Sequence, residues 1–162
     1  LRPWSTRRHW SEERTHWAAI QMMGVNATRI SRLVENWQLV CSLHEVIASE
    51  SQLVVLDVES TLQAMETGDD PPLPSSWEVT SDSIAARVAV ELGAGELVLL
   101  KSISAGTEDL GELAVQGVVD CHFPRAAEGL RVRIINLRER EPLSSTRSSC
   151  PGPKGPLSCG RP

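Results

Sequence analysis

A cluster of hydroxyl and carboxyl side chains, Thr80-Ser81-Asp82-Ser83, precedes a stretch that is predicted to be helical to Leu92. At a helix start the backbone N–H groups lack intrahelical partners and the helix dipole is positive, which favours an anion such as phosphate. Asp82 would repel a bare phosphate, so its useful role is to hold Mg²⁺ or to orient a lysine that touches the phosphate. The alternative is a plain N-cap, because Ser, Thr and Asp begin many helices.

Lys101-Ser102 is the second candidate, and it follows the apolar run Leu97-Val98-Leu99-Leu100. If that run is a buried strand, the lysine lies at its carboxyl end, where open parallel sheets bind their ligands. Such a lysine could reach a nucleotide phosphate. The alternative is a lysine that leaves the sheet for solvent.

The remaining polar candidates carry less weight. The four histidines show no spacing that suits a metal site. Asp120-Cys121-His122 suggests a nucleophile with a base, but adjacent residues in a strand or turn point apart. His16 and Trp17 are adjacent on a predicted helix, where such residues usually serve packing.

Helical and strand patterns alternate between residues 11 and 138. Apolar residues at three- and four-residue steps predict helices over 11–35 and 81–92, the second of which ends at Gly93. Unbroken apolar runs predict strands at 52–57 and 97–100 that are buried on both faces. Shorter signals predict helices near 44–49, 60–65, 109–115 and 123–129, a loop at 67–74, and a strand at 132–136. This alternation predicts a parallel sheet covered by helices.

Composition places the chain among cytoplasmic globular proteins. It has 162 residues, a net charge of −5 and 41% hydrophobic residues, without an apolar run long enough to cross a membrane. The acidic balance does not favour a nucleic-acid or membrane partner. The four cysteines form no C-x-x-C pair and are predicted to be reduced thiols. Residues 1–10 are predicted to be an irregular start, 11–138 the folded domain, and 139–162, rich in Pro, Gly and Ser, a disordered tail.

Two segments carry a family resemblance. Residues 76–86 (SWEVTSDSIAA) and 97–102 (LVLLKS) resemble the amino acid kinase superfamily, which includes the aspartate, glutamate and uridylate kinases. Within it the chain looks closest to a uridylate-kinase-like branch, which is similar to the methanofuran-pathway kinase that phosphorylates an aminomethylfuran phosphate. The helix around His16-Trp17 and the predicted strand 132–136 are also similar to that branch.

The resemblance implies a three-layer αβα sandwich with a mostly parallel sheet. It also implies transfer of the ATP γ-phosphoryl group, with Mg²⁺, to a carboxylate or phosphate of a small metabolite. Asp82 matches the aspartate that organises phosphate-binding lysines, and Thr80-Ser81 with Ser83 matches the substrate or phosphate contacts. Lys101 and Ser102 match the start of the nucleotide-binding half.

The family's opening strand, with its lysine and Gly-Gly turn, has no counterpart here, so the resemblance implies a domain that is incomplete at its N-terminus. Two further readings stay open: a non-catalytic nucleotide or anion-binding module, and an inactive fragment of such a kinase. Members of the family usually associate, so a homo-oligomer is also open.

Overall fold

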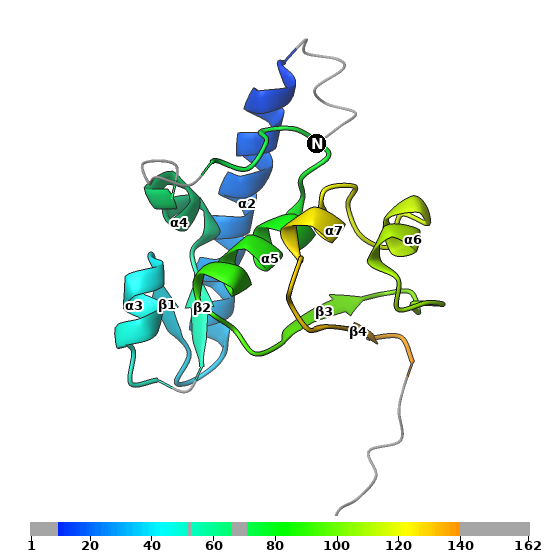
Figure 1. Ribbon diagram of the computed structural model, residues 1–162. Coiled ribbons are helices and arrows are strands. Elements are labelled where there is room, and N and C mark those ends of the chain that lie inside the picture. The colour runs from blue at the N-terminus through cyan, green and yellow to red at the C-terminus, as the bar shows by residue number, and fades with distance from the viewer. Residues whose placement is uncertain (1–9, 52, 66–70, 140–162) are drawn as a thin grey trace, which may run out of the picture.

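The computed structural model describes residues 10–51, 53–65 and 71–139 (Figure 1). Its elements, in chain order, are α2 (Glu12–Leu33), β1 (Gln38–Val40), α3 (Leu43–Ala48), β2 (Val54–Leu56), α4 (Val58–Met65), α5 (Ser81–Glu91), β3 (Leu97–Lys101), α6 (Leu110–Val115), α7 (Phe123–Ala126) and β4 (Val132–Asn136). Residues 1–9 of the predicted irregular start, most of the predicted tail and part of the predicted loop 67–74 lie outside the described residues. Among the described residues, no helix combines the length and the apolar character that a membrane span requires.

The long helix α2 forms where the sequence predicts it. Ser11 caps it by accepting a hydrogen bond from the Arg14 backbone N–H, and two glutamates follow in the positive first turn. The buried face of the helix recurs at helical spacing and includes His16, Ile20, Gly24 and Ala27. This face packs against α4 and the first strand pair.

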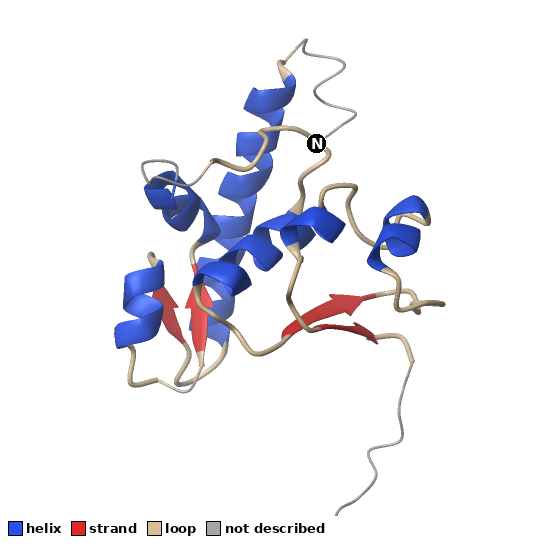
Figure 2. Cartoon of the chain, viewed as in Figure 1, coloured by secondary structure: helices blue, strands red, loops and turns tan. Residues whose placement is uncertain are grey.

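The strands pair in parallel, in two separate two-stranded sheets (Figure 2). In the first, Gln38 of β1 is opposite Val54 of β2. In the second, Leu97 of β3 is opposite Val132 of β4, and Lys101 is opposite Asn136. The structure confirms a mixed α/β chain with parallel pairing, while the described residues do not form the single continuous sheet that the alternation predicts.

The expectation that two strands are buried on both faces is wrong. Strand β2 is shorter than predicted, its residues are half-buried, and Leu53 just before it is exposed. In β3, Leu99 is buried, but the Leu100 side chain, on the other face, is 60% exposed. An apolar run can signal a buried strand, but in β3 Leu99 packs against residues of α5, α6 and α7 whereas the neighbouring Leu100 is exposed.

Helix α5 lies between two hydrophobic cores. On one side, its Ile84 packs with Ile20 of α2 and Leu62 of α4. On the other, its Ala86 packs with Leu99 of β3 and Phe123 of α7. Gly93, at φ 60°, follows the C-cap residue Leu92, as the sequence predicts. Because α5 packs against both cores, the start of this helix has a fixed position relative to β3.

Candidate functional site

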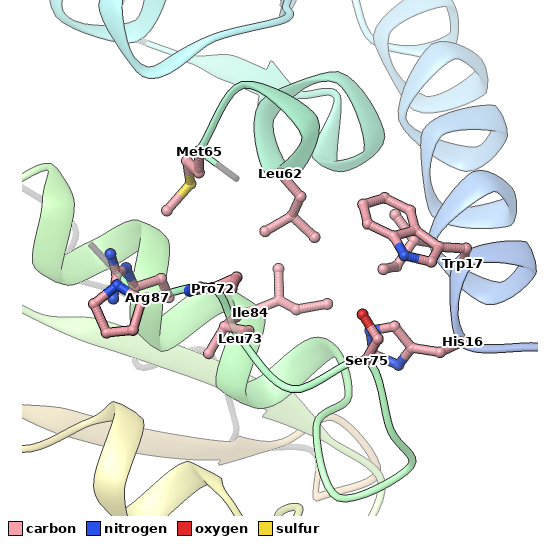
Figure 3. A pocket seen from close by; sticks show the side chains of 11 residues that line it. His16, Trp17, Leu62, Met65, Pro72, Leu73, Ser75, Ile84 and Arg87 are labelled. Carbon is pink, nitrogen blue, oxygen red and sulfur yellow. The ribbon is translucent and has the colours of Figure 1, made fainter. Parts of the chain in front are cut away.

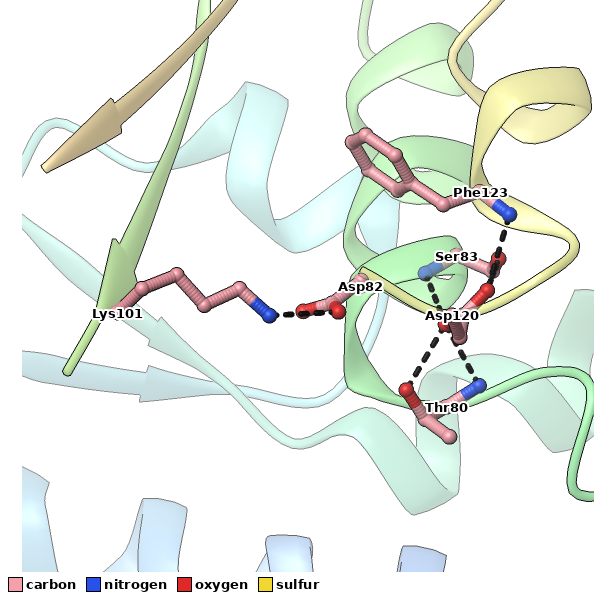
Figure 4. A network of polar contacts seen from close by, with 6 residues as sticks. All are labelled: Thr80, Asp82, Ser83, Lys101, Asp120 and Phe123. Carbon is pink, nitrogen blue, oxygen red and sulfur yellow. Dashed lines mark hydrogen bonds and ion pairs between the residues drawn. The ribbon is translucent and has the colours of Figure 1, made fainter. Parts of the chain in front are cut away.

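The start of α5 is capped by a residue from a distant loop. Thr80 has the extended backbone of an N-cap, but its own side chain makes no capping hydrogen bond. Instead, the Asp120 carboxylate accepts from Thr80 N (2.9 Å), Thr80 Oγ1 (2.8 Å) and Ser83 N (3.0 Å), and from Ser83 Oγ (Figure 4). The donors that were predicted to bind a phosphate therefore bind a carboxylate of the same chain.

Asp120 also binds the start of the next helix, α7, whose N-cap position is His122. Its Oδ1 accepts from the Phe123 N–H at 2.9 Å, in the first turn of α7. Burial acts to raise the pKa of the Asp120 carboxyl, but the hydrogen bonds from Ser83 and Thr80 outweigh it and hold the pKa below its ordinary value. Asp120 is therefore a carboxylate at neutral pH.

Asp82 and Lys101, which the sequence singled out as separate candidates, form an ion pair in the structure. The Lys101 Nζ lies 2.7 Å from Asp82 Oδ2, and the two side chains are 20% and 11% exposed, respectively. Asp82 comes from the first turn of α5 and Lys101 from the last position of β3, 19 residues later (Figure 4). Of the two roles considered for Asp82, holding Mg²⁺ or orienting a lysine, this geometry fits the second.

The two other predicted serines are on the surface. Ser81 and Ser102 are exposed, beside Asp82 and Lys101 in the sequence. Ser104, two residues further on, accepts a hydrogen bond from the Asn136 side-chain amide at 2.8 Å. The loop after β3 is thereby tied to the end of β4, so the carboxyl ends of both strands are held together beside Lys101.

The Asp120-Cys121-His122 segment does not assemble as a nucleophile with a base. The Asp120 side chain faces α5, whereas Cys121 is exposed. The backbone N–H of His122 donates to the Glu78 carbonyl at 3.1 Å, which ties this segment to the residues before α5. Its role in the structure is to carry Asp120 to the helix start.

A separate, largely apolar cavity lies between α2, α4 and α5 (Figure 3). His16, Trp17, Leu62 and Ile84 line it, and Arg87 stands at one side. Burial lowers the pKa of His16, while a hydrogen bond with the Ser76 backbone and the nearby Glu12 charge act in the opposite direction. A second, more open cleft lies along β4 and the loop before α6, and Lys101 and Asp82 line neither.

The described residues contain no group of three or more His, Cys, Asp or Glu side chains placed to hold a metal ion. Asp82 and Asp120, the carboxylates of this region, are engaged with Lys101 and with the helix start. Mg²⁺ in nucleotide sites is usually bound by one or two carboxylates together with substrate phosphates, and both carboxylates of this region already have partners.

Comparisons with known proteins give no match: no family model, no curated protein and no solved structure resembles the chain closely enough to report. The Lys101–Asp82 pair and the sequence resemblance described above are therefore the basis for a functional proposal.

Proposed function

We propose that this chain is an ATP-dependent phosphotransferase domain of the amino acid kinase type, with the αβα sandwich of that family. Lys101 binds a phosphate group of ATP, and Asp82 orients Lys101. ATP, with Mg²⁺, would supply the γ-phosphoryl group to a carboxylate or phosphate oxygen of a small metabolite. The observation that carries the proposal is the Lys101–Asp82 ion pair at the carboxyl end of a parallel strand.

The pair suits phosphate binding for a physical reason. A lysine ammonium carries three donors, and Asp82 engages the group from one side. The Lys101 side chain is 20% exposed, so in the proposal a phosphate oxygen reaches it from solvent. Because Asp82 holds the long side chain in place, less side-chain entropy is lost when the phosphate binds.

Catalysis by such a site is positioning combined with charge neutralisation, without a covalent intermediate. In the proposal, Lys101 offsets charge on the phosphates, while Ser81 and Ser102 can donate from the exposed rim. Thr80 and Ser83 act indirectly, since their donors hold Asp120.

The chain's lysine content allows a direct test. Lys101 and Lys154 are the two lysines of the sequence, so amine acylation followed by mass spectrometry compares a site lysine with a tail lysine in one molecule. Mg-ATP at ten times its Kd should slow acylation of Lys101 about tenfold, by simple occupancy, and leave Lys154 unchanged. Equal rates with and without saturating Mg-ATP would contradict the proposal.

Calorimetry with variants supplies the matched control. Lys101→Met should abolish measurable Mg-ATP binding. Arg133→Met removes the same charge near the opposite end of the β3–β4 pair, where Arg133 binds Glu96 at 3.0 Å, and should leave the affinity unchanged. If both variants bind Mg-ATP as the wild type does, Lys101 is not the phosphate contact.

One observation favours a second function, a non-catalytic nucleotide-binding module. The Asp120 carboxylate already occupies the donors at the start of α5, so fewer groups are left to stabilise a phosphoryl group in transit. Binding of Mg-ATP without release of ADP, in the presence of small carboxylate and phosphate acceptors, would select this module over the kinase. A chain that binds no Mg-ATP would select the inactive fragment.

A further inference from the structure

Asp120 holds two helices at once through a single side chain. Its Oδ2 accepts from Thr80 N, Thr80 Oγ1 and Ser83 N, and its Oδ1 accepts from Ser83 Oγ and Phe123 N. A carboxylate offers roughly four lone-pair positions, so both oxygens are fully engaged. Five donors on one carboxylate are more than a surface N-cap requires.

These contacts bracket Asp82. The residues that Asp120 holds, Thr80 and Ser83, lie on either side of Asp82 in the sequence, so they fix the first turn of α5. Asp82 leaves that turn toward Lys101, while Thr80 and Ser83 face Asp120 (Figure 4). A shift of this turn would move the Asp82 carboxylate relative to β3.

Packing in the hydrophobic core also fixes α5 relative to β3. Phe123, whose N–H binds Asp120, has a fully buried side chain in the cluster with Ala86 of α5 and Leu99 of β3. Helix α7, helix α5 and strand β3 are thus joined by packing, and Asp120 joins the two helices at their starts by hydrogen bonds.

We propose that Asp120 is a positioning residue: its carboxylate serves as a built-in anion that holds the start of α5 so that Asp82 can orient Lys101. The inference rests on the proposed function for the meaning of Lys101, but the positioning itself can be tested without a nucleotide. It also predicts that a ligand phosphate binds Lys101 and not the N–H groups of α5, because the Asp120 charge already occupies them.

The test measures the acylation rate of Lys101 relative to Lys154 in the full chain, with no nucleotide present. In Asp120→Ala the first turn of α5 loses its anchor and Lys101 loses its steady partner. We expect the Lys101 rate to rise on the order of tenfold, as expected for the loss of hydrogen bonds to a charged group. Asp82→Asn should give a rise of similar size.

A small anion should reverse the effect in one variant only. Formate can occupy the space left in Asp120→Ala and accept from the freed donors, so the Lys101 rate should return toward that of the wild type. In Asp82→Asn the partner of Lys101 itself is changed, so formate should leave the rate as it is. If formate does not lower the Lys101 rate in a folded Asp120→Ala protein, the inference that Asp120 acts as a built-in anion is overturned.

Asp109→Ala controls for a purely structural role. Asp109 caps α6 by accepting from Glu112 N at 2.9 Å, and α6 packs on the same core. This variant should lose stability through the lost cap but keep the Lys101 rate of the wild type. Equal acceleration in both variants, or none in Asp120→Ala, would overturn the inference.

If Asp120→Ala does not fold, Ser83→Ala removes one of the five donors and keeps the charge. It should raise the Lys101 rate about threefold, in keeping with the loss of one hydrogen bond, and an unchanged rate would count against the inference. The two proposals can fail separately. Loss of Mg-ATP protection would contradict the phosphotransferase, while an unchanged Lys101 rate in the Asp120 and Ser83 variants would contradict the positioning role.

Discussion

Gly24 lies in the middle of α2, where this helix passes the start of α4. A Cβ added at Gly24 would lie 2.8 Å from Asp57 Oδ1, closer than side chains normally approach. Asp57 cannot move freely, because its Oδ1 accepts from Glu59 N and its Oδ2 from Ser60 Oγ, both at 3.1 Å. Substitution of Gly24 by alanine therefore has two opposing effects: the higher helix propensity of alanine stabilises α2, and the steric conflict with Asp57, which caps α4, destabilises the protein.

The two effects have comparable size. Alanine in a helix interior is favoured over glycine by about 1 kcal/mol. Overpacking a tight contact costs about 1–3 kcal/mol. We therefore expect Gly24→Ala to lower the free energy of unfolding by roughly 0–2 kcal/mol in the wild type. In an Asp57→Ala background the conflict is gone, and the same substitution should raise it by about 1 kcal/mol.

The assay is a double-mutant cycle in urea, followed by tryptophan fluorescence, with the four proteins compared at equal denaturant slope. Asp57→Ala alone should cost about 1 kcal/mol through the lost α4 cap. The coupling between the two sites should be about 1–3 kcal/mol. If Gly24→Ala stabilises the protein equally in both backgrounds, the close approach of α2 to Asp57 is refuted.

Three further outcomes follow from the structure. Burial lowers the pKa of His16, so the neutral imidazole is favoured in the folded protein. Its contribution to stability is complete above the unfolded pKa of about 6.5 and declines as the pH falls through that value toward the folded pKa. His16→Gln should flatten the pH profile of Tm in this range, and a variant with the wild-type profile would contradict this. Asp82→Asn leaves the mostly buried Lys101 ammonium without its partner, whereas Lys101→Met leaves a carboxylate that the helix dipole still favours. In urea unfolding, Asp82→Asn should therefore lower the free energy of unfolding by about 0.5–1 kcal/mol more than Lys101→Met does. The reverse order would refute this reasoning. Among the described residues, the β3–β4 pair has unpaired edges, so light scattering should show that the protein associates. Leu100→Lys should reduce this association, whereas Val115→Lys, at an 89% exposed position of α6, should not. A clean monomer of the wild type would contradict this prediction.

The sequence predicts helices better than sheets in this protein, for a physical reason. The signals for α2 and α5 are local: a capping residue, a periodic apolar face and, for α5, the terminal Gly93. Strand β1 is three residues long and gives no pattern that distinguishes it from a short apolar loop. The pairing of strands two by two depends on contacts between distant segments, which apolar runs do not specify.

In the candidate site, too, the features with local sequence signals could be identified from the sequence and the long-range contacts could not. Asp82 and Lys101 could be singled out as candidates because each lies at the end of a recognisable element of one strand-and-helix unit, and the structure brings them together in an ion pair. The spacing of Asp120 and Phe123, three residues apart, could have identified Asp120 as a hydrogen-bond acceptor for the start of α7. Its second role at α5 involves residues 37 to 40 positions away, and no local pattern encodes that.

In the proposed function, Asp120 and Lys101 therefore have different tasks. A phosphate that bound the amides of α5 would have to displace Asp120, and the displaced carboxylate would lose its contacts with both helices. A phosphate that binds Lys101 gains a cation that is already oriented and displaces nothing that holds the fold. The negative charge of Asp120 holds the starts of the two helices, and in the proposed function the positive charge of Lys101 serves phosphate recognition. On this reasoning, phosphate affinity should follow Lys101, and the stability of the α5 start should follow Asp120.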